Sequence, residues 1–128
     1  MKKNFLLFLL IITQTGFSNT KITETQKLAT TCKIWGFLKY YHPNVADGSK
    51  NWDEQLFTIL PLVEKAQTKE EFSLVLENWI NGLGEIKEVE PIVATKEIEY
   101  FDKNFDLSWI DKNKLLSKKL SKKILKVY

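Results

Sequence analysis

The chain has 128 residues, of which 27% are charged, and a formal net charge of +3. It contains no arginine, which argues against a protein that reads nucleic acid through guanidinium groups. Its single cysteine, Cys32, excludes an intrachain disulfide, and with a single histidine, His42, it provides too few ligands for a zinc site, so we expect no metal and no cofactor.

The N-terminus has the three parts of a secretory signal peptide. Lys2 and Lys3 are positive, residues 5–12 are an unbroken apolar stretch, and Gly16 and Ser18 are small residues suited to cleavage. The eight apolar residues are fewer than the roughly 20 that span a bilayer. We expect cleavage near Ser18 and a periplasmic or extracellular protein. The alternative is an N-terminal hydrophobic anchor or a core helix.

The first predicted helix covers residues 23–41 and ends before Pro43, because a residue that precedes proline is disfavoured in the α region. Thr23 or Thr25 is expected to cap its start. Apolar residues recur along it at steps of three and four, which is the helical period: Leu28, Cys32, Trp35 and Leu38. We predict that this side is buried and that Cys32 is an inert thiol.

The second half of this helix is apolar around nearly its whole circumference. Such a helix must be buried on most sides, and a small chain can hardly surround it. We therefore predict that part of this surface contacts a protein or peptide partner, or another domain. The predicted binding residues are Trp35, Phe37, Tyr40, Tyr41, His42 and Trp52. For His42 a structural role at the helix C-terminus is preferred to a catalytic or ligand-binding role.

Two further helices are predicted from their N-terminal caps. Asn51 with Glu54, and Thr68 with Glu71, have the spacing of capping boxes. Pro61 is expected to kink or end the first of these helices. Gly82 and Gly84 are expected to stop the second. The predicted core consists of Leu28, Cys32, Trp35, Leu38, Leu56, Phe57, Leu60, Phe72, Leu76 and Trp79.

The remaining chain is charged. Residues 85–110 are read as an acidic, partly extended linker with an apolar docking anchor near Trp109, and Asp111 is expected to cap a final helix over residues 111–128. One side of that helix is apolar and the other carries lysines: Lys118, Lys119, Lys122, Lys123 and Lys126. An ordinary solvated face is preferred to a membrane-surface helix.

These patterns predict an all-α fold, a small array of three to four helices with an irregular acidic linker and a lysine-rich C-terminal helix. The predicted divisions are residues 1–18 as signal peptide, 19–84 as the helical domain, 85–110 as linker and 111–128 as the final helix. Neighbouring acids such as Glu70 with Glu71 fall in helix first turns, where they complement the helix dipole. No phosphate loop or catalytic triad is present. We predict no catalytic residue.

Residues 33–43, KIWGFLKYYHP, followed by the NWDE of residues 51–54 and by Leu60-Pro61, resemble the N-terminal helical domain of exported C-terminal-processing (tail-specific, tricorn-like) serine peptidases. The resemblance covers residues 28–84. In that family this region precedes a PDZ module and a mixed α/β domain that hydrolyses peptide bonds with a serine nucleophile and a lysine base. Those segments have no counterpart in this sequence, so no catalytic residue is carried over.

Three functions are consistent with these features. The first is a non-catalytic N-terminal domain or fragment of such a peptidase. A truncated product of this kind would explain why the helix of residues 23–41 is apolar on nearly all sides. It would also explain why the last helix has no C-terminal cap. The second is a standalone binding or regulatory module that docks to a peptidase or an exported peptide. The third is a membrane-surface protein that acts through the lysine-rich helix. No nucleic-acid partner is expected.

Overall fold

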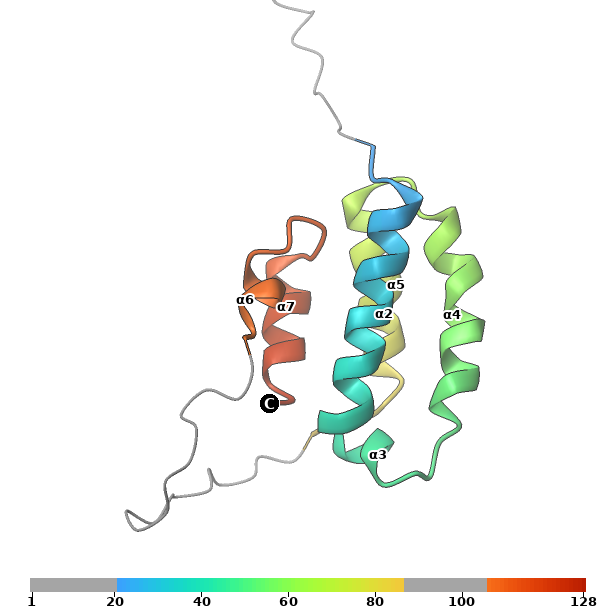
Figure 1. Ribbon diagram of the computed structural model, residues 1–128, viewed down its shortest axis with the longest axis vertical. Helices are drawn as coiled ribbons and strands as arrows, with labels where there is room; N and C mark the ends of the chain where they lie inside the picture. The colour runs from blue at the N-terminus through green and yellow to red at the C-terminus, as the bar shows by residue number, and fades with distance from the viewer. Residues whose placement is uncertain (1–20, 87–105) are drawn as a thin grey trace, which may run out of the picture.

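The computed structural model describes residues 21–86 and 106–128, and in these two ranges it is a small all-α array without strands (Figure 1). Its helices are α2 (Glu24–Tyr41), α3 (Pro43–Ala46), α4 (Trp52–Lys65), α5 (Lys69–Asn81), α6 (Ser108–Asp111) and α7 (Lys118–Leu125). The predicted fold class is confirmed. The predicted signal peptide and most of the predicted linker lie outside the described residues.

The three long helices α2, α4 and α5 lie side by side, and α6 and α7 pack on the other side of α2 and α5 (Figure 1). α3 is a single turn at the end of α2. Side chains from these elements meet in one apolar core, which includes Ile34, Val63, Leu76 and Ile124. Residues 21–86 and 106–128 therefore share one core.

The starts of the three long helices are set by caps that the sequence predicts. The Thr23 hydroxyl accepts the Gln26 amide N–H at 3.2 Å, and the Gln26 side chain accepts the Thr23 amide N–H at 3.1 Å. Asn51 caps α4, and Thr68 with Glu71 forms the capping box of α5. Each cap satisfies amide groups that have no partner within the first turn of a helix.

The buried side of α2 differs from the predicted one. Leu28 and Cys32 are exposed, and Trp35 is only half-buried. Of the four predicted residues, Leu38 is fully buried as expected, and the others that face the core are Lys27, Thr30, Thr31, Ile34 and Phe37. The predicted face was wrong because polar residues on the other side find partners inside the protein, so their burial does not leave polar groups unsatisfied. The Thr31 hydroxyl, for instance, donates to the Lys27 carbonyl at 2.8 Å.

In α4 the prediction was wrong about Phe57, which is 71% exposed. The core side of this helix carries Trp52, Ile59 and Val63. Pro61 does not end the helix, which continues to Lys65. Pro61 itself is exposed, so water can replace the hydrogen bond that its missing N–H would have made.

The core side of α5 is the predicted one, with Phe72 and Leu76 fully buried and Trp79 nearly so. The helix ends at Asn81, and Gly84 takes the left-handed backbone conformation with φ +89°. A residue with a Cβ would be strained at that position. The chain turns there toward the α2–α3 junction, where the Asn44 amide donates to the Leu83 carbonyl at 2.8 Å.

The C-terminal part begins differently from the prediction. Asp111 is the last residue of α6, and the cap of the final helix is Ser117, whose hydroxyl accepts the Leu120 amide N–H at 3.1 Å. A Ser cap is preferred here because it satisfies a first-turn amide. The predicted phase of α7 is correct, since Leu120 and Ile124 are fully buried and its lysines lie on the other side.

Candidate functional site

Two concave surfaces on the described part of the chain contain predicted binding residues of the α2 segment. The first, called the aromatic groove here, has a volume of about 620 Å³ and lies between α2 and the α6 segment. Its lining residues are Cys32, Lys33, Gly36, Phe37, Tyr40, Tyr41 and Trp109. Gly36 contributes no side chain, and nothing lies within 4 Å of where a Cβ would be. The glycine therefore leaves open space beside its backbone in the lining of the groove.

Stacked rings form one wall of the aromatic groove. The Phe37 and Tyr41 rings lie 4.8 Å apart, and the Trp109 ring meets Phe37 edge-on at 6.1 Å. Tyr41 also meets the Tyr128 ring edge-on at 5.3 Å. Tyr40, one position before Tyr41, is 76% exposed. The groove thus combines a packed aromatic wall with one tyrosine that projects into solvent.

The six predicted binding residues separate into three groups. Phe37, Tyr40 and Tyr41 line the aromatic groove. Trp35 and Trp52 form part of the packing between α2 and α4, so their role in the described structure is to join helices. The sixth residue, His42, lies in the second concave surface. Only half of the predicted set therefore shares one surface.

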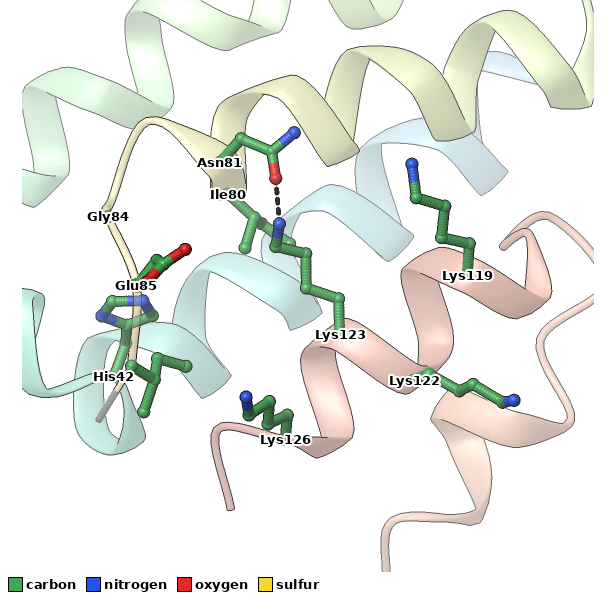
Figure 2. Close-up of a pocket in the computed structure, with 10 residues that line it drawn as sticks. His42, Ile80, Asn81, Gly84, Glu85, Lys119, Lys122, Lys123 and Lys126 are labelled. Atoms are coloured by element: carbon green, nitrogen blue, oxygen red, sulfur yellow. Dashed lines mark hydrogen bonds between the residues drawn. The ribbon is translucent and has the colours of Figure 1, made fainter. Parts of the chain in front are cut away.

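The second concave surface, called the lysine pocket here, has a volume of about 680 Å³ and lies between α7, the end of α5 and the α2–α3 junction (Figure 2). Its lining residues are His42, Ile80, Asn81, Gly84, Glu85, Ile86, Lys119, Lys122, Lys123 and Lys126. Figure 2 shows Lys123 and Lys126 pointing toward the side formed by His42 and Asn81, whereas Lys122 extends away from it. The helical period of α7 places all four lysines along one side of that helix.

His42 is fully buried in the wall of the lysine pocket. It ends α2 and caps α3, and its Nδ1 accepts the Asn44 amide N–H at 3.3 Å. Burial, followed by the nearby positive charge of Lys50, lowers the pKa of His42 from its ordinary value of 6.5. The ring is therefore neutral at pH 7. Because Nδ1 is an acceptor, the proton of the neutral ring is on Nε2.

The Nε2–H of His42 has no hydrogen-bond partner among the described residues, although it is buried. Buried donors in native proteins nearly always have a partner, so each exception calls for an explanation. The predicted structural role of His42 explains the hydrogen bond at Nδ1, which caps α3. That role does not explain why the buried Nε2–H lacks a hydrogen-bond partner.

The lysine charges are only partly neutralised. Lys119 forms an ion pair with Glu77, and the Lys123 ammonium donates to the neutral Asn81 amide oxygen, as Figure 2 shows. In the described ranges, no carboxylate lies within ion-pair distance of Lys122, Lys123 or Lys126. Glu85 is the acidic residue in the lining. The pocket therefore carries excess positive charge.

Sequence reasoning missed the lysine pocket because its parts are far apart in the chain. The sequence predicts an ordinary solvated face for the lysines of α7 and groups His42 with its aromatic neighbours. The sequence also predicts an apolar docking anchor near Trp109, and in the structure the Trp109 ring contacts Phe37 while Ile110 is fully buried. Cys32 and His42 line different surfaces, so they do not form a nucleophile–base pair.

Within residues 21–86 and 106–128, no group of three or more His, Cys, Asp or Glu side chains is placed to hold a metal ion. No helix in these ranges combines the length and apolar character that crossing a membrane requires. Comparison with protein-family models, with curated proteins and with solved structures finds no match to this chain.

Proposed function

We propose that this chain is an exported, non-catalytic helical domain that acts by binding a C-terminal-processing serine peptidase. The partner surface would belong to the PDZ module or the catalytic domain of that enzyme, either in the same polypeptide or in a separate one. The aromatic motif of residues 33–43 supports this proposal through its resemblance to the helical domain of those peptidases.

The observation that carries the proposal is the exposure of Tyr40 beside the aromatic groove. Tyr40 is 76% exposed although it lies within the most aromatic segment of the chain. Tyrosine is enriched in protein interfaces because its ring supplies apolar contact area while its hydroxyl finds a polar partner. Lys33 at the same groove adds a charged rim. A protein surface that buries Tyr40 would have the apolar centre and polar edge usual for interfaces.

The membrane-surface alternative receives less support from α7. An interfacial helix inserts its apolar side among the lipids. In this structure the apolar side of α7 is in the protein core, with Leu120 and Ile124 fully buried. Only the lysine side of the helix is left for a surface, and it contains no apolar anchor. Contact with lipid would then be electrostatic alone.

The test places a photoreactive phenylalanine analogue at position 40 in the source organism and identifies the polypeptide that becomes cross-linked. We expect a peptidase with PDZ and catalytic domains, or, if the chain is continuous with them, an immunoblot band several times heavier than the chain itself. Position 57 is the matched control, because Phe57 is an aromatic residue of similar exposure on α4, away from the groove.

The proposal fails if the immunoblot detects a polypeptide of the size of this chain alone and position 40 cross-links only to polypeptides unrelated to peptidases. It also fails if positions 40 and 57 capture the same polypeptides in similar yield. Either result would show that the aromatic groove does not select a peptidase.

A further inference from the structure

The lysine pocket combines a buried hydrogen-bond donor with uncompensated positive charge. The donor is His42 Nε2–H, and the charge comes mainly from Lys123 and Lys126, which point toward the same side of the pocket in Figure 2. We propose that this pocket binds a small organic anion with two or more oxyanion groups. One oxygen of the ligand accepts the Nε2–H bond, and the others lie among the lysine ammonium groups.

The histidine contributes the specific part of the site. A buried N–H without a partner destabilises the folded protein, and an acceptor that enters the pocket removes that penalty. The ring cannot turn to find another partner without releasing Nδ1 from the Asn44 amide, which it holds at 3.3 Å. The Nδ1 bond therefore holds the ring in place, and a ligand oxygen reaches the covered Nε2 when the pocket wall over it moves aside.

The charges of the pocket favour an anion over a neutral ligand. The lining contains four lysines and one acid, Glu85, and Glu77 pairs with Lys119 outside the lining. Lys50 adds a further positive charge near His42. Because the chain has no arginine, the site offers lysine ammonium groups rather than guanidinium groups that bind two oxygens at once. Ammonium groups can bind carboxylate or phosphate oxygens alike.

The size and the apolar part of the pocket favour an organic molecule over a single inorganic ion. Its volume of about 680 Å³ falls in the range of roughly 300–1,000 Å³ that is typical of small-molecule sites. Ile80 and Ile86 supply apolar wall beside the charged groups. A compact anion with several carboxylate or phosphate groups fits this combination. This site shares no lining residue with the aromatic groove, so it does not depend on the peptidase proposal.

The experiment titrates citrate and, separately, pyrophosphate into the full chain at pH 7 and low salt. His42 is the only histidine, so its ring nitrogens give unambiguous nuclear magnetic resonance signals. We expect a saturable, single-site shift of the Nε2 signal and its loss at high salt, which screens exposed charges. A stronger response to citrate assigns a polycarboxylate ligand, and a stronger response to pyrophosphate assigns a polyphosphate ligand.

Charge variants separate a defined site from general attraction. The double variant Lys123→Gln, Lys126→Gln should weaken binding at least tenfold, about the effect of one lost charge contact. The matched control Lys65→Gln, Lys69→Gln removes the same charge from exposed positions outside the pocket and should change the affinity less than twofold. Equal weakening by both double variants overturns the proposal.

The variant His42→Asn tests the donor separately. Asparagine keeps a side-chain oxygen to accept the Asn44 amide N–H at the start of α3, but it lacks the Nε2–H donor. We expect at least tenfold weaker binding while the Asn44 amide signal stays in its folded position. In the wild type, the proposal is overturned if neither anion binds, or if an anion binds without moving the His42 Nε2 signal.

Discussion

Trp35 and Trp52 each donate the indole N–H to the other residue's backbone carbonyl, at 3.2 Å and 3.0 Å. The Trp52 ring also stacks on Trp79, with centroids 4.7 Å apart and planes 7° from parallel. These three tryptophans come from α2, α4 and α5, so one aromatic unit joins the three long helices. The Lys39 ammonium lies over the Trp35 ring, 4.7 Å from its centre.

Replacing Trp52 with phenylalanine should therefore destabilise the fold. The variant keeps an aromatic ring in the core but removes the indole donor and leaves space beside Trp79. We expect the free energy of unfolding to fall by about 2–3 kcal/mol, measured by urea denaturation. The control is Trp109→Phe, because the Trp109 indole makes no hydrogen bond among the described residues and is only half-buried. If both variants lose the same stability, the reciprocal hydrogen bonds do not matter.

Lys27 should prove to be a structural lysine. Its side chain is 1% exposed, and its ammonium donates to the Glu64 and Ala66 carbonyls at 2.6 Å and 2.9 Å and pairs with Glu24 at 2.8 Å. It thereby satisfies carbonyls at the end of α4, which have no partner within that helix. Lys27→Met leaves them without a donor and should lower the free energy of unfolding by about 3 kcal/mol.

Lys65→Met is the matched control for Lys27, because Lys65 is an exposed lysine near the same end of α4. We expect it to change stability by less than about 0.5 kcal/mol in the same denaturation experiment. A Lys27→Met variant as stable as this control would show that water, rather than the lysine, satisfies those carbonyls.

Lys27 also explains why the buried side of α2 could not be predicted from its sequence. Hydrophobic periodicity assigns the side with Leu28 and Cys32 to the core, because the other side begins with a lysine and two threonines. Burial of Lys27 is favourable only because α4 presents its carbonyls there, and that depends on tertiary structure. By contrast, the caps at Thr68 and Glu71 act within a few residues, so the sequence predicted them correctly.

The two candidate sites show the same difference between features that are local in the sequence and features that depend on tertiary structure. The aromatic half of α2 was recognisable in the sequence, and Phe37 and Tyr41 do form a surface with Tyr40. The lysine pocket was not recognisable, because His42 and Lys126 come together only when α7 packs beside the α2–α3 junction. No spacing rule relates residues that are so far apart in the chain.

Folding stability should depend on pH between pH 5 and 7 through His42. Its pKa in the folded chain is lowered from 6.5 by burial and by Lys50, so the folded state binds fewer protons than the unfolded state in this window. The contribution of neutral His42 to the free energy of unfolding is therefore fully present above pH 6.5, and it is lost as the pH decreases toward the folded-state pKa. Thermal melts at several pH values should show this decline, and His42→Asn should remove it.

The pH effect of His42 can be separated from that of the carboxylates. Hydrogen bonds from Ser49 and Ser108 lower the pKa values of Asp47 and Asp106 from 3.8, so their contribution is lost only at still lower pH. A melting temperature that stays constant from pH 7 to pH 5 in the wild type would contradict the buried, neutral histidine.

Cys32 should react as an accessible thiol in the native protein. The helix places it on the exposed side of α2 at the aromatic groove, contrary to the buried thiol that the periodicity predicts. We expect a chromogenic disulfide reagent to label the folded chain completely without denaturant and with unchanged helical circular dichroism. Cys32→Ser supplies the zero-signal control. Labelling that requires guanidinium would show that Cys32 faces the core after all.

Ser73 should hold the C-terminal part of the chain to α5. Its hydroxyl donates to the Leu115 carbonyl at 2.8 Å and accepts the Ser117 amide N–H at 2.9 Å, immediately before α7 begins. Ser73→Ala removes both bonds and leaves two backbone groups without partners. We expect a loss of about 1–3 kcal/mol of stability. Amide exchange in α7 should become faster than in α4, because the lost bonds anchor only α7.

The control for this variant is Ser49→Ala, since Ser49 is exposed in the loop before α4 and its hydrogen bonds go to its neighbour Asp47 rather than to α7. It should leave amide exchange in α7 unchanged.

The lysine pocket gives a second measurement, because α7 supplies its lysines. If Ser73→Ala loosens α7, citrate binding at His42 should weaken as well, whereas the Ser49→Ala chain should bind citrate as the wild type does. Unchanged exchange in α7 of Ser73→Ala would mean that the apolar contacts of Leu120 and Ile124 are sufficient to hold the helix in place.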